Sequence, residues 1–197
     1  MPKIVDHAAR RHEISVAAMR VLARSGPDGL TLRALARELK GSITLVTHFY
    51  ADRQTLLAGI IDELSTNYDD DVASLPLTGD RVEDLRAYLL WMVPLTPEEI
   101  DIERCRVALV HSADNSAIAS FFDSMEGRAR SAFRARLNGL IDEDAMGEAI
   151  DFLRTLVNGA VLSAVEHPQY WTEERQRAMV ERGLAALGLV GVQSANG

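Results

Sequence analysis

Apolar residues recur at intervals of three and four positions through most of this chain, a spacing that predicts amphipathic α-helices. One helical face is apolar from Leu32 to Leu39, and another from Leu45 to Tyr50. Residues 40–42, Lys-Gly-Ser, separate these two runs with the chemistry of a tight turn. Two short helices joined in this way predict a helix-turn-helix motif.

The segments on both sides of this motif follow the same helical spacing. A leading helix is predicted from about residue 8 to residue 24, because Gly, Pro, Asp and Gly at 26–29 end it. After the motif, Asp52 is placed to cap a helix that continues past Tyr68. Nothing alternates like a β-strand. The sequence therefore predicts an all-α fold of about nine helices, the later ones at about 80–93, 96–111, 114–138, 143–166 and 172–189.

The outer face of the second motif helix is polar. Ser42, Thr44, Thr47 and His48 lie away from its apolar positions. Short hydroxyls and an imidazole can reach phosphates and base edges when such a helix lies in the major groove of DNA. The same residues would also suit the solvated side of an amphipathic helix, so the pattern alone leaves both interpretations open.

Residues from about 10 to 62 resemble the DNA-binding domain of the tetracycline-repressor (TetR) family of bacterial transcription regulators. Gly26 ends the first helix as in the family, and Thr31 opens the second. The further matching positions lie in the two motif helices and at the start of the next helix: Leu35-Ala36, Ser42, Phe49-Tyr50, Arg53 and Leu56-Leu57. Two positions depart from the family pattern. The turn has Lys40 where the family usually has Gly, and the recognition helix has Thr47 where it usually has a phosphate-contacting Tyr.

This resemblance implies a helix-turn-helix DNA-binding domain at residues 1–52 and an α-helical ligand-binding and dimerisation domain at 53–197. It also implies a homodimeric transcriptional regulator, a repressor by analogy, that binds a palindromic operator in double-stranded DNA and is released by a small molecule. Arg53 takes the place of the family's usual Lys. The expected DNA contacts are Thr31, Arg33, Ser42, Ile43, Thr44, Leu45, Thr47, His48 and Arg53.

Charge is unevenly divided along the chain. The net charge at pH 7 is −8, yet residues 1–53 hold nine Lys and Arg against five Asp and Glu, and the remainder holds 12 against 24. A segment of net charge +4 beside a body of −12 is typical of a phosphate-binding module on an acidic domain. A basic end can also arise by chance, but here it coincides with the helix-turn-helix pattern.

Composition indicates the class of the protein and its expected cellular location. Hydrophobic residues make up 47% of the 197 residues and charged residues 25%, as in soluble globular proteins. No apolar run approaches the ~18 residues that a membrane span needs, and residues 1–7 lack the apolar core of a signal peptide. The single Cys105 and the lack of a metal-spaced His pair argue against a disulfide or a metal site. We therefore expect a cytoplasmic protein without a cofactor.

The central helices hold the residues from which a ligand cavity would be built. Such cavities are lined mainly by apolar and aromatic groups with a few polar anchors, so we expect a largely apolar effector. Most of the candidates are expected to be ordinary core, since aromatic residues dominate cores too, and a backbone carbonyl would satisfy His111 as well as a ligand would. The candidates are Tyr88, Trp91, Met92, Val107, His111, Phe121, Phe122, Met125, Phe152, Leu156 and Asn158.

The last two helices carry more apolar surface than a single buried stripe needs. The helix predicted at 143–166 is apolar nearly all round, which requires burial on more than one face. The resembled family dimerises by packing these two helices against their copies as a four-helix bundle, so we predict a homodimer. The alternative, in which one protomer satisfies both stripes, stays open.

Two other functions fit parts of the sequence. One is a constitutive DNA-binding regulator that senses no ligand, which a solid core in place of a cavity would favour. The other is an all-helical enzyme that uses His111. Cys105 and His111 lie on different faces of one predicted helix, and the chain has no nucleophile elbow or glycine-rich phosphate loop, so we predict that the protein is not an enzyme.

Overall fold

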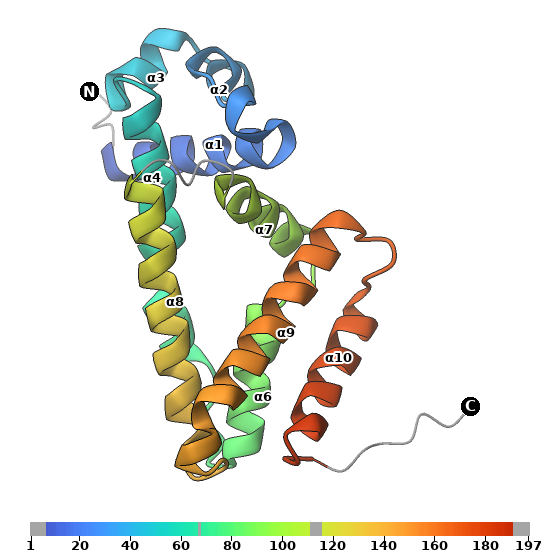
Figure 1. Cartoon of the computed structure of the whole chain (residues 1–197). Helices are drawn as coiled ribbons and strands as arrows, with labels where there is room; N and C mark the ends of the chain where they lie inside the picture. Colours follow the sequence, from blue (N-terminus) through green and yellow to red (C-terminus); the bar gives the residue numbers. More distant parts are fainter. Residues whose placement is uncertain (1–6, 67, 111–115, 191–197) are drawn as a thin grey trace. The chain divides into compact units, whose positions relative to one another are not determined.

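A computed structural model describes residues 7–66, 68–110 and 116–190. Within these ranges the chain forms α-helices and one short 3-10 helix without any β-strand, so the predicted all-α fold is confirmed. None of the helices described is long and apolar enough to cross a membrane. The elements, labelled in Figure 1, are α1 (His7–Gly29), α2 (Leu32–Glu38), α3 (Ile43–Phe49), α4 (Arg53–Thr66), α5 (Tyr68–Ser74), α6 (Arg81–Met92), α7 (Pro97–Val110), α8 (Ser116–Leu137), η1 (Glu143–Ala145), α9 (Met146–Glu166) and α10 (Glu173–Ala186).

Three predicted helices differ in detail from the observed ones. Gly26 has a φ of 66°, so the first helix breaks where predicted, and a short helical segment then follows as far as Gly29. The helix expected to run past Tyr68 consists of α4 and α5, and residue 67 between them lies outside the described residues. The long helix predicted from residue 143 begins with the 3-10 turn η1 and becomes α-helical at Met146.

The chain forms two compact units. Unit 1 contains Met1–Asp70 and Asp101–Asp123, and unit 2 contains Asp71–Ile100 and Ser124–Gly197. The helix-turn-helix therefore shares a unit with α4, most of α7 and the start of α8. This division follows packing, whereas the boundary expected between residues 52 and 53 follows function. The functional boundary stays a prediction.

α1 supplies the centre of the unit 1 core, and α2 and α4 pack directly against it. The apolar stripe of α1 was expected from the sequence, and its side chains are buried. Each Leu or Ile removed from water in this way contributes about 1.5–3 kcal/mol to folding. α1, α2, α3, α4, α7 and α8 each provide core residues that are at most 1% exposed: Ile14, Val21, Leu22, Leu35, Val46, Leu56, Ile60, Cys105, Leu109 and Ile118.

Tyr50, which follows the last residue of α3, joins three helices of unit 1. Its side chain is 4% exposed, and its hydroxyl shares a buried hydrogen bond of 2.8 Å with the Ser15 hydroxyl of α1. Its ring lies against Gly59 of α4, where a Cβ atom would come within 2.7 Å of the ring. Gly59 is therefore required for space, and the end of α3 is held by α1 and α4 together.

In unit 2, an aromatic core and a charged network hold the helices together. Tyr88 is fully buried, and its ring meets Phe133 edge to face at 5.0 Å. The Arg154 guanidinium of α9 donates two hydrogen bonds, of 3.0 and 2.6 Å, to the Glu126 carboxylate of α8. These bonds lower the pKa of Glu126 below its ordinary value and outweigh the opposing effect of burial.

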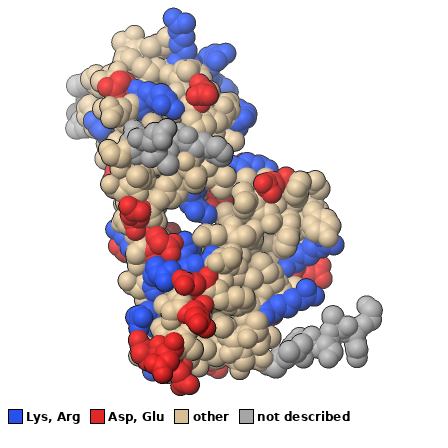
Figure 2. Space-filling view, in the orientation of Figure 1, with Lys and Arg blue, Asp and Glu red and all other residues tan. Residues whose placement is uncertain are grey.

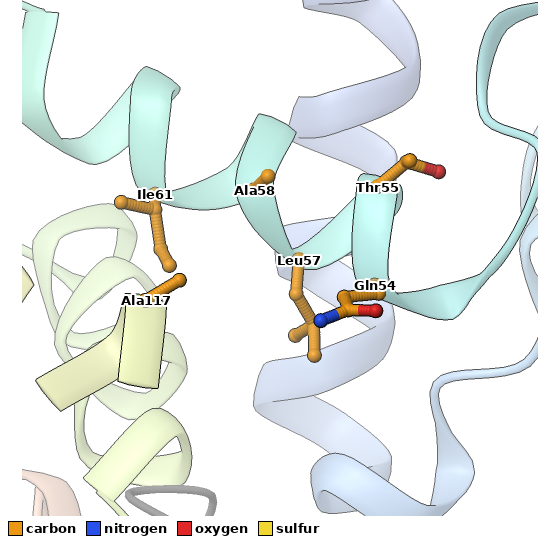
Figure 3. Close-up of a pocket in the computed structure, with 6 residues that line it drawn as sticks. All are labelled: Gln54, Thr55, Leu57, Ala58, Ile61 and Ala117. Carbon is orange, nitrogen blue, oxygen red and sulfur yellow. The ribbon is translucent and has the colours of Figure 1, made fainter. Parts of the chain in front are cut away.

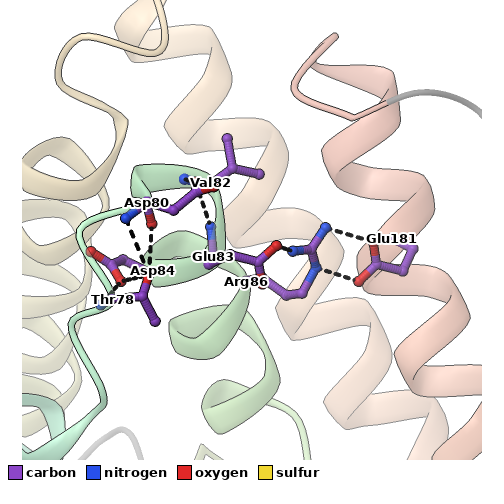
Figure 4. A network of polar contacts seen from close by, with 7 residues as sticks. All are labelled: Thr78, Asp80, Val82, Glu83, Asp84, Arg86 and Glu181. Carbon is purple, nitrogen blue, oxygen red and sulfur yellow. Dashed lines mark hydrogen bonds and ion pairs between the residues drawn. The ribbon is translucent and has the colours of Figure 1, made fainter.

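Hydrogen bonds and ion pairs between side chains fix the start of α6 and join this helix to α10 (Figure 4). The Asp80 carboxylate accepts hydrogen bonds from the backbone N–H groups of Val82 and Glu83, as the sequence predicted for a helix cap. The Glu83 side chain pairs with Arg86 instead of returning to the cap. Arg86 also forms a bidentate ion pair with Glu181, which ties α6 to α10 and raises the pKa of the guanidinium.

Candidate nucleic-acid interface

The turn of the helix-turn-helix depends on Lys40. The Lys40 N–H donates to the Arg37 carbonyl at 3.1 Å, and the Gly41 N–H donates to the Ala36 carbonyl at 2.9 Å. This pair of bonds is a Schellman motif, which places the residue after the helix C-cap in the left-handed region. Lys40 has a φ of 50°, so it adopts the conformation for which glycine is favoured.

Gly41 has a different role. Its φ is outside the left-handed region, so backbone conformation does not require glycine here. A Cβ atom on Gly41 would lie 2.9 Å from the Leu45 side chain, which packs against the core at the start of α3. The glycine thus stands one residue later than in the family pattern, and Lys40 adopts the left-handed conformation of the turn.

Hydroxyl side chains cap both motif helices. Thr31 Oγ1 accepts from the Ala34 N–H at 3.1 Å, which confirms the predicted cap of α2. Ser42 Oγ accepts from the Leu45 N–H at 3.2 Å and caps α3. Each hydroxyl still has its own proton to donate, so the cap role is compatible with a phosphate contact.

The polar side of α3 is exposed as the sequence predicted. Ile43, Thr44, Thr47 and His48 are all exposed. The Thr47 hydroxyl donates to the Thr44 carbonyl at 3.2 Å, so it is engaged within the helix. The His48 ring meets Phe49 edge to face at 5.0 Å and lies 6.1 Å from the His7 ring.

Leu45 differs from the other expected contacts on α3. Its side chain is partly buried and packs against the unit 1 core. The helical spacing places it between the outer face and the core, and the structure assigns it a packing role at this edge. A contact of Leu45 with DNA stays a prediction.

Basic residues divide into paired and unpaired groups across α1 and α2. Arg24 and Arg20 of α1 pair with Glu38 of α2 at 2.8 and 3.5 Å, and chiefly the Arg24 hydrogen bond lowers the pKa of Glu38. Arg33, Arg37 and Lys40 are exposed at positions i, i+4 and i+7, and the described residues provide no ion pair for them. We call these three the α2 basic stripe.

Figure 2 shows Lys and Arg side chains projecting from the end of unit 1 where α2 and α3 lie. Only Arg33 of the stripe was predicted as a DNA contact. Arg37 and Lys40 were missed, although Arg37 follows Arg33 by one helical turn on α2 and Lys40 lies in the turn directly after this helix.

Arg53 has a structural contact that the sequence did not reveal. Its guanidinium donates to the Pro27 carbonyl at 3.0 Å and ties the start of α4 to the end of α1. The side chain is exposed, and four further N–H groups are available on the guanidinium. A phosphate contact by Arg53 stays a prediction.

Comparison with known proteins adds to this geometry. Residues 81–189, more than half of the chain, match the TetR-family domain described as BetI-type transcriptional repressor, C-terminal. The chain belongs to the TetR family. It is a transcriptional regulator, and the family implies DNA binding, which fits the helix-turn-helix observed in unit 1.

Individual proteins similar to this chain are transcriptional regulators as well. The chain is 27% identical over 189 residues to the HTH-type transcriptional regulator PksA of Bacillus subtilis (strain 168), a match that covers 91% of this chain and 90% of PksA. A transcriptional regulator from Rhodococcus sp. Rha1 has the same fold, with a TM-score of 0.81 and 20% identity over 90% of this chain and 95% of that chain. A regulator from Saccharomonospora viridis, solved in complex with choline, has a TM-score of 0.74 and 18% identity over 90% and 96%.

The residues predicted to bind a ligand in this TetR-family regulator fall in both units. Val107, Phe121 and Phe122 belong to unit 1, and His111 lies outside the described residues. The members in unit 2 are Tyr88, Trp91, Met92, Met125, Phe152, Leu156 and Asn158. Each ligand contact stays a prediction.

Among these candidates, Tyr88 is buried in the core, whereas Asn158 and Phe152 are exposed. Tyr88 stacks on Trp91 at 5.9 Å and has the Arg136 guanidinium 4.3 Å from its ring centroid, so it has a full set of core contacts. Asn158, predicted as a polar anchor, is exposed, so it is not a polar group buried among apolar neighbours. Phe152 is also exposed, at 38%. Both belong to the outward side of α9.

A groove of about 280 Å³ lies between α4 and the first turn of α8 within unit 1 (Figure 3). Its volume is at the lower end of small-molecule sites. None of the predicted ligand-binding residues within the described part of the chain lines this groove. Its lining residues are Gln54, Thr55, Leu57, Ala58, Ile61 and Ala117.

The described residues also bear on chemical reactivity. No group of three or more His, Cys, Asp or Glu side chains among them is arranged to hold a metal ion. Burial, with a smaller contribution from Glu103, raises the pKa of the Cys105 thiol to about 12. The thiol therefore stays protonated at neutral pH and is a poor nucleophile.

The left-handed conformation of Lys40 leads to a stability prediction. A side chain in this region costs about 1–2 kcal/mol, part of which is offset by the larger unfolded-state entropy of glycine. We expect Lys40→Gly to raise the free energy of unfolding by about 0.5–1 kcal/mol, or Tm by about 1–4 °C, in thermal unfolding. Lys40→Ala is the control, because it removes the charge but keeps the Cβ and should leave Tm close to that of the wild type. Equal Tm values for the two variants would contradict the strain argument.

Proposed function

We propose that this TetR-family protein is a ligand-responsive repressor that binds a palindromic operator in double-stranded DNA as a homodimer. The observation that carries the proposal is the exposed polar face of α3 beside the unpaired α2 basic stripe. In a helix-turn-helix, the second helix enters the major groove while the first crosses the phosphate backbone. The polar face of α3 can form hydrogen bonds with base edges in the groove, and the α2 basic stripe can bind the phosphates that α2 crosses.

The proposed DNA contacts divide into those that position and those that specify. Arg33, Arg37 and Lys40 supply cations along the outside of α2, and Thr31 and Arg53 add phosphate contacts at the starts of α2 and α4. Specificity comes from α3, where Ser42, Thr44, Thr47 and His48 face outward with Ile43. Thr47 also stands where the family usually has a phosphate-contacting Tyr, and it has a shorter reach than that Tyr.

The proposed dimer is formed by the outward sides of α9 and α10. Phe152 and Leu162 on α9 are 38% and 45% exposed, and Gly159 between them has open space where a Cβ would lie. An apolar face with a small residue at its centre allows two helices to pack closely. A two-fold dimer would then present two α3 helices to successive half-sites.

The proposed effector is a small, largely apolar molecule bound among the central helices. A regulator of the same fold was solved in complex with choline, which supports a ligand-binding role for this architecture. Effector binding would favour an arrangement of α4 in which the two recognition helices of the dimer no longer match the operator spacing. Operator affinity would then fall by at most the ratio of the effector's affinities for this arrangement and for the DNA-binding arrangement.

The test is selection of DNA from a random-sequence pool by the purified protein at moderate salt, followed by sequencing. We expect a palindrome with two half-sites about one helical turn or more apart, because a homodimer reads the same sequence twice. Failure of the folded protein to enrich any sequence, in the absence of added ligand, would contradict the proposed function.

Removal of one cation from the α2 basic stripe should change the salt dependence of operator binding. We expect Arg37→Ala to weaken binding and to reduce the slope of log K against log salt by about one, because one phosphate contact is lost. Arg24→Ala is the matched control, since it removes the same charge from a guanidinium already paired with Glu38. Titrations at several salt concentrations measure both slopes. Equal slopes for Arg37→Ala and the wild type would remove Arg37 from the interface.

A charge on the outward side of α9 should separate the protomers. Leu162→Arg places a guanidinium in the proposed interface, so we expect a monomer in analytical ultracentrifugation and at least a tenfold loss of operator affinity. Leu77→Arg is the control, because Leu77 is even more exposed, at 76%, and lies in the loop before α6. A Leu162→Arg protein that still sediments as a dimer would place the interface elsewhere.

A further inference from the structure

The recognition helix exposes one large apolar side chain. Ile43 is the first residue of α3, and it is 44% exposed. Among the described residues of α1 to α4, no other large apolar side chain reaches this class of exposure. The apolar residues of these helices otherwise lie in or against the core, so Ile43 is separate from the packing of unit 1.

Local structure gives no advantage to isoleucine at this position. Alanine has a higher helix propensity, and β-branched residues lose χ1 freedom in a helix. That stiffness does place the side-chain methyl groups in one well-defined direction. Because the N-terminal residues of a recognition helix meet the base edges, Ile43 would present fixed apolar atoms to the floor of the major groove.

The hydroxyl groups next to Ile43 are partly engaged within the helix. Ser42 accepts from the Leu45 N–H, and the Thr47 hydroxyl donates to the Thr44 carbonyl. Ile43 has no polar group to satisfy, so it is suited to an apolar partner. Of the base edges in the major groove, only thymine presents an apolar group, its C5-methyl.

We infer that Ile43 determines operator sequence by packing against the C5-methyl group of a thymine at one fixed position in each half-site. This inference rests on the proposed function, because it names a base that the proposed DNA-reading helix recognises. Thr44 and His48, unlike Ile43, carry groups that can form hydrogen bonds with base edges.

The experiment uses the operator recovered by selection and replaces each thymine of the half-site in turn by deoxyuridine, symmetrically in both half-sites. This change deletes only the methyl group. Burial of one such group is worth about a fourfold change in affinity, so two half-sites give up to about 16-fold. We expect one thymine whose replacement weakens the wild type by about this factor, and we expect Ile43→Ala to bind the thymine and uracil operators equally.

The matched control is Ile102→Ala on α7. Ile102 is 47% exposed and belongs to the same unit, so it has the same chemistry and exposure away from α3. This variant should keep the full thymine preference. The inference is overturned if the half-site lacks thymine, if no replacement weakens the wild type, or if Ile43→Ala keeps the preference. If no operator is recovered at all, the proposed function fails first, and the two failures are thereby distinguished.

Discussion

The orientation of the recognition helix depends on Tyr50. Its buried hydroxyl requires a partner and finds Ser15 of α1 at 2.8 Å. Its ring lies on Gly59 of α4, in contact so close that a single methyl group would not fit. A close-packed contact of this kind has few alternative arrangements. The exposed side of α3 can present a defined set of groups to DNA because the end of this helix is fixed to two others.

This joint gives the proposed release by a ligand a physical basis within unit 1. Gly59 lies in the interior of α4, so a tilt or shift of α4 moves the surface on which the Tyr50 ring rests. Arg53 adds a second tie between α4 and the end of α1 through the Pro27 carbonyl. A recognition helix that follows α4 away from α1 loses the buried Tyr50–Ser15 hydrogen bond, worth about 1 kcal/mol, and one that stays with α1 loses the packing of its Tyr50 ring on Gly59. Both outcomes would change how α3 meets a fixed operator.

The features that could be predicted from the sequence are those that depend on interactions between residues a few positions apart. Helix caps at Thr31 and Asp80 were predicted correctly because the cap and the amides that it serves are two or three positions apart. The buried stripe of α1 follows in the same way from helical spacing. The Tyr50 hydrogen bond to Ser15 could not be predicted, because it joins residues 35 positions apart.

The ligand-binding residues could be predicted only as a set of candidates. An aromatic residue in a core and one in a cavity give the same pattern, and Tyr88 proves to have the contacts of a core residue. On α9, which is apolar nearly all round, the pattern does not say which side faces the protomer, so the exposure of Asn158 was not foreseen. Because α9 also has exposed apolar side chains, Phe152 and Leu162, a second copy of the chain is the proposed partner for its outward side.

The charges of unit 1 show why the position of a charge matters more than the net charge. Arg20 and Arg24 share the single carboxylate of Glu38, and these ion pairs link α1 to α2. The α2 basic stripe contributes nothing comparable to the fold. Lys40, at its end, even adopts a left-handed conformation that glycine would adopt at lower cost. Strain of this kind is typical of functional sites, and in the proposed function a cation facing the phosphate backbone is what the lysine provides in return.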